Sequence, residues 1–278
     1  MDARYIRSGM GLISTAELAA LIGSRHLGVF DVRTDLADPQ AGRRRYDAGH
    51  VPGAVFVDLE RDLTGREGPG RHPLPRPEEF SATARRLGIG PSTDVVAYDD
   101  DGGAWAARLW WMLRSLGHEQ VRVLDGGFPK WESEGLPVTT AVPRPIPGDF
   151  ATVRDWRWVV NRHDVAATDA QLIDARAPER FSGEREPIDP VAGHIPGAIN
   201  LPYADNLAPD GTFLEPSALA RRYDAVDENP IVYCGSGVSA CHDILAMHLA
   251  GRDDARLYEG SWSDWSRHQD APVGIGDR

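Results

Sequence analysis

The sequence predicts an α/β protein built from two similar domains, each with a mainly parallel β-sheet flanked by helices. Two observations lead to this fold class. Short β-branched runs alternate with helical patterns along the chain, and one ordered set of motifs occurs twice. A chain of 278 residues is long enough for two domains that each bury a hydrophobic core.

The expected strands and helices follow from local patterns. Apolar runs predict strands at 29–32, 95–98, 121–124, 172–175, 231–233 and 256–258. Ser14 and Glu17 have the spacing of a capping box, which predicts that a helix begins there. Further helices are expected over 104–116 and from Ala240 onward. Strands that alternate with helices in this way favour a parallel sheet.

The repeat sets the expected domain boundaries. Gly-His-Val-Pro-Gly-Ala at 49–54 returns as Gly-His-Ile-Pro-Gly-Ala at 193–198. Prolines between the two copies cannot continue a helix and favour an extended connector. We therefore expect an N-terminal domain over 1–140, a proline-rich linker over 141–155 and a C-terminal domain over 156–278.

A second repeated motif is expected to support folding. Asp31 and Arg33 in the first half return as Asp174 and Arg176 in the second. Because the pair occurs in both halves, whereas reactive groups do not, an ion pair within the fold is expected at each position.

Composition excludes several classes of function. The formal net charge of −12 disfavours binding to nucleic acid, which needs clustered basic residues. No segment approaches the length of about 18 apolar residues that a membrane span needs, and the first eight residues lack a hydrophobic leader. The two cysteines provide no disulfide framework and no metal-type spacing. We expect a cytoplasmic protein that binds neither metal nor cofactor.

Cys234 is the most informative residue of the sequence, because cysteine is reactive and the residues on either side of it predict where it lies in the fold. It follows the apolar run 231–233 and precedes the glycine-rich loop 235–239 and a helical pattern. Backbone N–H groups of such a loop and the positive end of a helix stabilise an anion, so they favour a thiolate at this sulfur. The equivalent position in the first half is Asp99, which cannot act as a sulfur nucleophile. Only the second half is therefore expected to perform thiol chemistry.

These motifs together resemble the tandem-domain rhodaneses. The resemblance rests on Cys-Gly-Ser-Gly-Val-Ser-Ala at 234–240, on both Gly-His-x-Pro-Gly-Ala segments, and on the segments 110–114 and 124–128. It extends from about residue 12 to residue 266 and so covers nearly the whole chain. The resemblance implies two rhodanese-like domains and an enzyme that transfers sulfur.

The reaction that the resemblance implies proceeds through a persulfide on Cys234. Within the family, the loop is most similar to that of members that use 3-mercaptopyruvate and release pyruvate. The sulfur then passes to cyanide or to a thiol acceptor such as thioredoxin. The backbone of the loop would surround the sulfur, through Gly235, Ser236, Gly237, Val238, Ser239 and Ala240. The neutral residues at 235 and 236 suit a monoanionic keto acid better than dianionic thiosulfate.

Other site residues also come from the resemblance. Arg180 matches the family's carboxylate-binding arginine. The family has a second arginine a few residues later, where this sequence has Pro187. Arg185, two residues before Pro187, is therefore the candidate for the second arginine. Ser236 would protonate the leaving enolate or help to activate the thiol, or it would only cap the following helix.

The two Gly-His motifs assign different roles to their histidines. His50 matches a histidine that the family places near the active-site serine, and Asp38 and Asp47 are both candidates for its acidic partner. His194, its copy in the second half, is expected to stabilise a turn. Cys241, inside the helix, is expected to be structural.

Four other functions are alternatives to this interpretation. A thiosulfate sulfurtransferase or a non-catalytic persulfide carrier would use the same loop. A phosphatase of this fold requires Cys-x5-Arg, but Ala240 stands at the arginine position. Dinucleotide binding fits the spacing of Gly235, Gly237 and Ala240, but fewer than 20 residues follow Glu259, too few for the rest of that fold.

Overall fold

The computed structural model describes residues 11–152 and 154–276, and these fall into two compact units. The first unit contains residues up to Thr64, the segment Pro75–Arg157 and the short segment Ala208–Phe213. The second contains Gly65–Leu74, Trp158–Leu207 and the chain from Leu214 onward. The first eight residues, on which the expectation of no leader rests, lie outside the described part.

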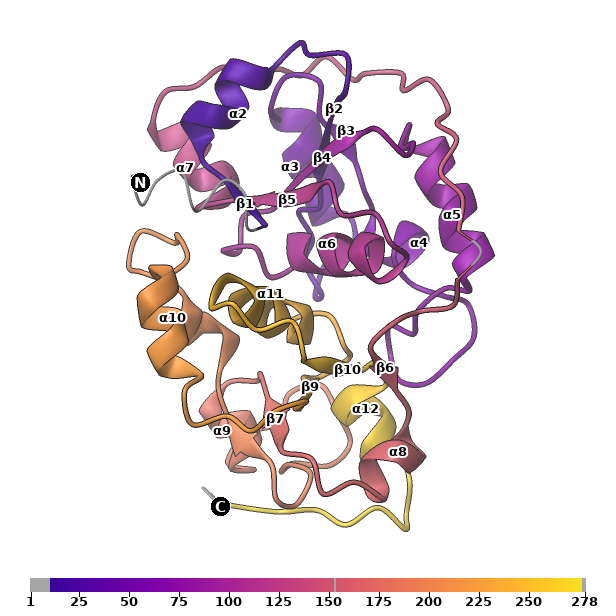
Figure 1. The fold of residues 1–278 in the computed structure, drawn as a ribbon, viewed down its shortest axis with the longest axis vertical. Coiled ribbons are helices and arrows are strands. Elements are labelled where there is room, and N and C mark those ends of the chain that lie inside the picture. The colour runs from indigo at the N-terminus through magenta and orange to yellow at the C-terminus, as the bar shows by residue number, and fades with distance from the viewer. Residues whose placement is uncertain (1–10, 153, 277–278) are drawn as a thin grey trace. The chain divides into compact units, whose positions relative to one another are not determined.

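Each unit contains one five-stranded sheet, and all neighbouring strands are parallel. The first sheet has the order β1 (Leu12–Ile13), β5 (Val121–Leu124), β4 (Asp94–Tyr98), β2 (Leu27–Asp31) and β3 (Val55–Phe56). The second has the order β6 (Val159–Val160), β10 (Arg256–Tyr258), β9 (Ile231–Tyr233), β7 (Leu172–Asp174) and β8 (Ile199–Asn200). The strand order is the same in both units (Figure 1), which confirms the predicted repeat and parallel sheets.

Helices flank both sheets. The first unit has α2 (Thr15–Leu21), α3 (Ala41–Ala48), α4 (Leu59–Asp62), α5 (Pro77–Arg86), α6 (Ala106–Ser115) and α7 (Gly127–Ser133). The second has α8 (Arg162–Ala166), α9 (Pro178–Phe181), the 3-10 turn η1 (Tyr203–Asn206), α10 (Pro216–Arg222), α11 (Ala240–Leu249) and α12 (Ser261–Trp265). The predicted capping box of Ser14 and Glu17 opens α2, and α6 is slightly shorter than the predicted helix 104–116.

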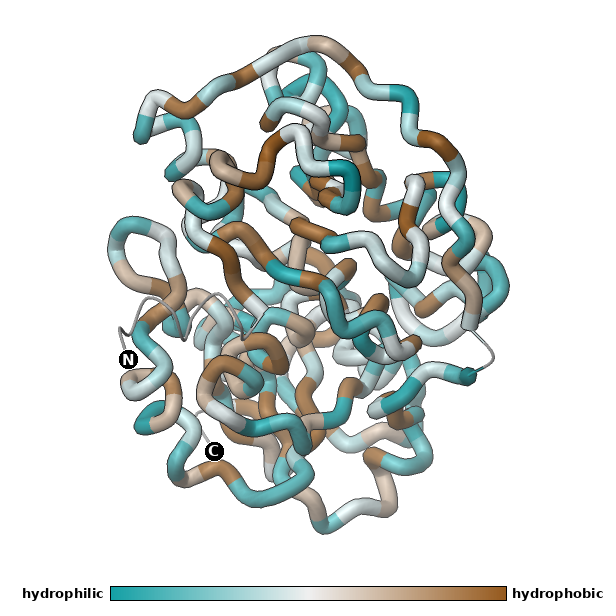
Figure 2. The backbone as a smooth tube through the Cα atoms, turned by 45° about the horizontal axis from the view of Figure 1, so that its top comes forward, coloured by the Kyte–Doolittle hydropathy of each residue, from teal (hydrophilic) through white to brown (hydrophobic). Residues whose placement is uncertain are grey.

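The apolar faces of these elements form the cores. In the first unit Leu18, Val96 and Trp131 belong to one buried cluster, and in the second Ile231, Phe181 and Trp262 belong to its counterpart. Figure 2 shows hydrophobic stretches in the interior and hydrophilic stretches on many outer turns. Residues 141–152 contain no helix or strand. Among the described helices, none is both long and apolar enough to cross a membrane.

The repeated Asp–Arg motif forms an ion pair in both units. Arg33 bonds to Asp31 at 2.6 Å, and Arg176 bonds to Asp174 at 2.6 Å. All four side chains are buried, and each guanidinium also donates to the carbonyl of the glycine before the repeated histidine, at 2.7 Å. The prediction of a folding role is confirmed, because each pair ties the end of a strand to the loop that carries the Gly-His motif.

The two histidines of the Gly-His motifs have equivalent surroundings. The ring of His50 stacks on Tyr46 with centroids 3.8 Å apart, and the ring of His194 stacks on Phe181 at the same separation. In each case Nδ1 lies 2.8 Å from the backbone carbonyl oxygen of the stacking partner. His194 therefore stabilises the turn as expected, and His50 does the same in the first unit.

Candidate active site

Cys234 lies where β9 ends and the loop into α11 begins. Its side chain is buried, with 1% of the residue exposed. The N–H of Gly237 donates to Cys234 Sγ at 3.2 Å. The backbone of Cys234 is held on both sides, because its N–H donates to Ser261 Oγ at 3.1 Å and its carbonyl accepts from the N–H of Trp262 at 3.0 Å. The sulfur therefore has a fixed position at the carboxyl end of the sheet.

The loop after Cys234 curves tightly around the sulfur. Gly237 has a φ of +77°, and a Cβ at this position would lie 2.4 Å from the carbonyl oxygen of Glu259. Glycine is therefore the residue that permits this turn. Val238 and Ser239 complete the loop, and Ala240 begins the ten-residue helix α11. The sulfur thus lies near the positive end of a helix, where an anion is favoured.

Ser236 contacts a histidine that the sequence analysis did not name. The Nδ1 atom of His72 lies 2.6 Å from Ser236 Oγ, and both residues are buried. His72 belongs to the segment Gly65–Leu74, which is part of the second unit. The neighbouring N–H groups of Arg71 and Leu74 donate to Ser263 Oγ at 3.0 Å and to Glu259 Oε2 at 2.9 Å. These bonds hold the segment against the loop that follows β10.

The described contacts of His50 lie within the first unit. Its Nε2 lies 3.2 Å from the carbonyl oxygen of Ala141, and its Nδ1 faces the carbonyl of Tyr46, as described above. The two acidic candidates have arginine partners, Arg44 at 2.5 Å for Asp38 and Arg43 at 2.8 Å for Asp47. Within the second unit, the histidine that contacts Ser236 is His72.

Two arginines lie over Gly235. A Cβ at Gly235 would be 2.9 Å from Nη2 of Arg71 and 3.4 Å from Nη1 of Arg180. Their side chains retain 21% and 17% exposure, so both guanidinium groups can reach solvent. Arg180 was predicted, whereas Arg71 was not. Arg185, the other candidate, is exposed, and its N–H donates to the carbonyl of Glu179.

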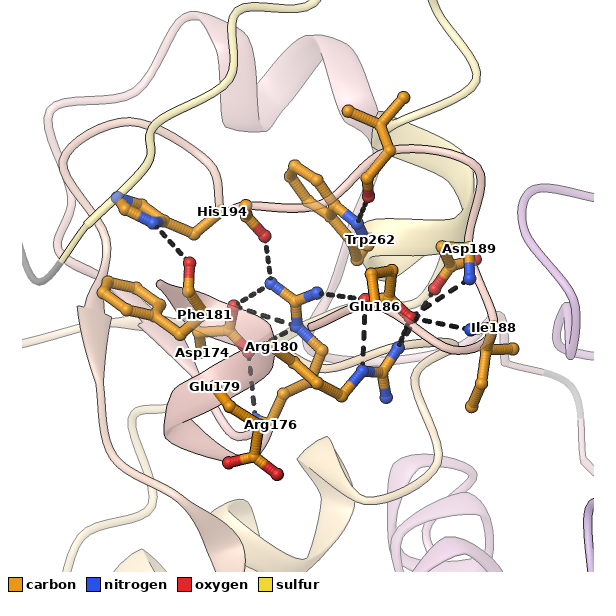
Figure 3. A network of polar contacts seen from close by, with 12 residues as sticks. Asp174, Arg176, Glu179, Arg180, Phe181, Glu186, Ile188, Asp189, His194 and Trp262 are labelled. Carbon is orange, nitrogen blue, oxygen red and sulfur yellow. Dashed lines mark hydrogen bonds and ion pairs between the residues drawn. The ribbon is translucent and has the colours of Figure 1, made fainter. Parts of the chain in front are cut away.

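Buried carboxylates pair with both arginines, and Figure 3 shows those beside Arg180. Glu186 accepts from Arg180 at 2.7 Å and from Arg176 at 3.1 Å. Asp189 pairs with Arg180 at 3.2 Å and also with Arg71. Burial opposes ionisation of both acids. Hydrogen bonds from Arg180 and two backbone N–H groups nevertheless leave the pKa of Glu186 below its ordinary value, while burial raises the pKa of Asp189.

Cys241 lies within α11, and its Sγ–H donates to the carbonyl of Gly237 at 3.4 Å. It is buried, and both cysteines are free thiols. This arrangement agrees with the expected structural role. In the described ranges, no group of three or more histidine, cysteine or acidic side chains could hold a metal ion.

Comparisons with known proteins identify close relatives of the whole chain. The Rhodanese-like domain family matches residues 14–134 and 157–268. A probable 3-mercaptopyruvate sulfurtransferase from Pseudomonas aeruginosa is 46% identical, over 97% of this chain and 100% of the relative. A putative thiosulfate sulfurtransferase from Mycobacterium tuberculosis is 45% identical, over 96% and 98%. The structure of 3-mercaptopyruvate sulfurtransferase from Leishmania major superimposes with a TM-score of 0.85 at 30% identity, covering 95% of this chain and 76% of that chain.

Proposed function

The chain belongs to the rhodanese family and is a sulfurtransferase, and on that premise we propose that it takes sulfur from 3-mercaptopyruvate and releases pyruvate. The relatives carry names of both 3-mercaptopyruvate and thiosulfate sulfurtransferases, so the choice of donor depends on the site. The observation that carries the proposal is the combination of a neutral loop beside the sulfur with two arginines over Gly235.

The two arginines provide a binding site for the donor's carboxylate. Guanidinium groups match carboxylates in geometry as well as charge, and two of them can hold one carboxylate in a defined orientation. Arg71 and Arg180 come from different segments, and both lie beside Gly235, the residue that follows the nucleophile. A donor held there by its carboxylate would place its sulfur near Cys234.

Transfer then requires one nucleophilic substitution at sulfur. The thiolate of Cys234 attacks the thiol sulfur of 3-mercaptopyruvate and forms an S–S bond as the C–S bond breaks. The electron pair of that bond leaves with the three-carbon fragment as the enolate of pyruvate, and one proton converts the enolate to pyruvate. The enzyme retains the transferred sulfur as a Cys234 persulfide. When this persulfide releases the proton of the donor's thiol, the loop amides and the helix stabilise its negative charge.

Ser236 and His72 supply that proton. The serine hydroxyl donates it to the enolate, and His72, whose Nδ1 lies 2.6 Å from the serine oxygen, restores it. Histidine suits this role because it gains and loses protons near neutral pH. Helix capping by Ser236, the structural alternative, receives no support, because Ser239 occupies the position before α11.

The second half of the cycle delivers the outer sulfur to an acceptor. Cyanide attacks the persulfide to give thiocyanate and regenerates the Cys234 thiolate. A thiol acceptor such as thioredoxin would instead take the sulfur as its own persulfide. The two free thiols suit a reducing compartment such as the cytoplasm.

A comparison of donors tests the proposal. Initial rates are measured with 3-mercaptopyruvate and with thiosulfate, using cyanide as the acceptor and assays for pyruvate and thiocyanate. We expect a higher kcat/KM with 3-mercaptopyruvate and steady release of pyruvate. Faster turnover with thiosulfate would instead favour a thiosulfate sulfurtransferase, and a single burst of pyruvate without turnover would favour a persulfide carrier.

A further inference from the structure

The two arginines of the proposed donor site share one buried carboxylate. Asp189 pairs through Oδ1 with Arg71 and through Oδ2 with Arg180, the latter at 3.2 Å. The Asp189 side chain is only 1% exposed, whereas both arginines retain contact with solvent. The carboxylate is therefore more deeply buried than the two guanidinium groups with which it pairs.

The orientation of Asp189 is built into its loop. The N–H groups of Ile188 and Asp189 both donate to Glu186 Oε1 at 3.1 Å, which turns the chain between these residues. Arg71 is fixed separately, because its backbone N–H donates to Ser263 Oγ at 3.0 Å. Asp189 therefore links the segment of Arg71 to Arg180 of α9. Figure 3 shows Asp189 and Ile188 beside Glu186 and Arg180.

The surrounding charges cancel. The connected network contains three guanidinium groups and three carboxylates, those of Arg71, Arg176, Arg180, Asp174, Glu186 and Asp189. A site with two arginines and no buried acid would attract a dianion more strongly than a monoanion. With the acids present, the arginines keep their hydrogen-bonding geometry, but the excess positive charge is removed.

We propose that Asp189 is a positioning residue that sets donor preference: by pairing with both arginines, it makes the site favour a monoanionic keto acid over dianionic thiosulfate. This inference rests on the proposed function and assigns the choice of donor to a residue outside the catalytic loop. Thiosulfate carries one more negative charge than 3-mercaptopyruvate, so removal of the Asp189 charge would improve binding of thiosulfate more.

The test is the ratio of kcat/KM for thiosulfate to kcat/KM for 3-mercaptopyruvate. We expect Asp189→Asn to raise this ratio about tenfold, mainly through a lower KM for thiosulfate, as one additional unit of net positive charge implies. The increase should shrink at high ionic strength, because the effect is electrostatic. Asp189→Glu, which keeps the charge, should restore the ratio toward the wild-type value.

A matched control removes a similar charge elsewhere in the second unit. Asp254 pairs with Arg252 at 3.0 Å and precedes β10. Because β9 and β10 are parallel, Asp254 lies at the amino end of these strands, whereas Cys234 follows the carboxyl end of β9. Asp254→Asn should leave the ratio unchanged. Asp189→Ser is measured beside Asp189→Asn, so that a folded variant without the charge is available if the asparagine is not tolerated.

The outcomes separate this inference from the proposed function. A folded variant without the Asp189 charge that keeps the wild-type ratio, or that shifts further toward 3-mercaptopyruvate, would overturn the inference alone. A wild-type enzyme that prefers thiosulfate would overturn the proposed function. An increase in the ratio in Asp189→Asn or Asp189→Ser, reversed by Asp189→Glu and absent in Asp254→Asn, would support both.

Discussion

Asp99 in the first unit and Cys234 in the second occupy equivalent positions, yet the loops that follow them surround different side chains. Each residue follows the equivalent strand, β4 or β9, of its sheet. Each backbone carbonyl accepts from an equivalent N–H, that of Phe128 at 2.8 Å for Asp99 and that of Trp262 at 3.0 Å for Cys234. The difference between the loops therefore does not come from the position of the strand end.

The Asp99 loop is closed on its own carboxylate. Oδ1 accepts from the N–H groups of Asp101 and Gly103 at 2.9 Å, and Oδ2 accepts from those of Trp105 and Ala106 at 2.8 Å. Burial raises the pKa of Asp99 to about 6, against the opposing effect of the N–H groups of Ala106, Asp101 and Gly103. The N–H groups of this loop are therefore bonded to the buried side chain of Asp99, which has a structural role.

The Cys234 loop instead lies among polar side chains from other segments. Its sulfur accepts from the N–H of Gly237, and Ser236, His72 and two arginines gather around the same turn. The comparison teaches that one strand-to-helix turn can serve folding or catalysis. The residue at the end of the strand and the side chains brought to it decide which.

The largest expected effect is on sulfur transfer. Cys234→Ser should lower kcat by at least about a thousandfold, because an alcohol at this position cannot form the persulfide. Pyruvate release measures the effect, and the circular dichroism spectrum should stay the same. Cys241→Ser is the matched control and should keep most activity. Substantial turnover by Cys234→Ser would mean that the reactive sulfur lies elsewhere.

A substitution of Asp99 should lower the stability of the protein. Asp99→Asn places an NH₂ group against two of the four N–H donors, so we expect the free energy of unfolding to fall by about 3 kcal/mol. Urea unfolding measures this loss, and kcat per folded molecule should change little. An unfolding free energy equal to that of the wild type would show that the four hydrogen bonds do not hold the loop together.

Substitutions of His72 and His50 should show the same contrast between an effect on activity and an effect on stability. His72→Asn should lower kcat about a hundredfold, because it removes the group that restores the proton of Ser236. His50→Asn should instead lower stability, because it removes the stacking on Tyr46, and should leave kcat within about twofold. Pyruvate release and thermal unfolding distinguish these effects. A loss of kcat in His50→Asn equal to that in His72→Asn would show that His50 acts in catalysis as well.

The smallest expected effect concerns donor binding. Arg180→Ala should raise KM for 3-mercaptopyruvate about tenfold, because it removes one charged hydrogen-bonding group from the proposed carboxylate site. Arg185→Ala, a change to an exposed arginine in the same segment, is the control and should leave KM unchanged. Steady-state kinetics measure both values. An unchanged KM in Arg180→Ala would remove this residue from the donor site.

Local patterns in the sequence predict the fold and the position of the nucleophile. Alternating strands and helices, the capping box at Ser14 and the duplicated motifs correspond to elements of the structure, because each depends on residues close together in the chain. The same holds for the turn after Cys234, whose glycines and following helix are consecutive.

The residues around the nucleophile could not be predicted in this way. Arg71 and His72 lie in a segment without helix or strand that is far from Cys234 in the sequence, and only tertiary packing brings it there. Asp189 is an ordinary acidic loop residue until the fold places two arginines against it. His50 was predicted from the resemblance to the family, and in the first unit it makes the same backbone contact as its copy His194 makes in the second.

The most direct test of the account is the mass of the intact protein after brief incubation with 3-mercaptopyruvate and no acceptor, followed by peptide mapping. We expect one added sulfur atom, located on Cys234 in the second unit, removed by cyanide and absent in Cys234→Ser. Added sulfur on Cys241, or a protein that releases pyruvate without ever carrying sulfur on Cys234, would contradict the account.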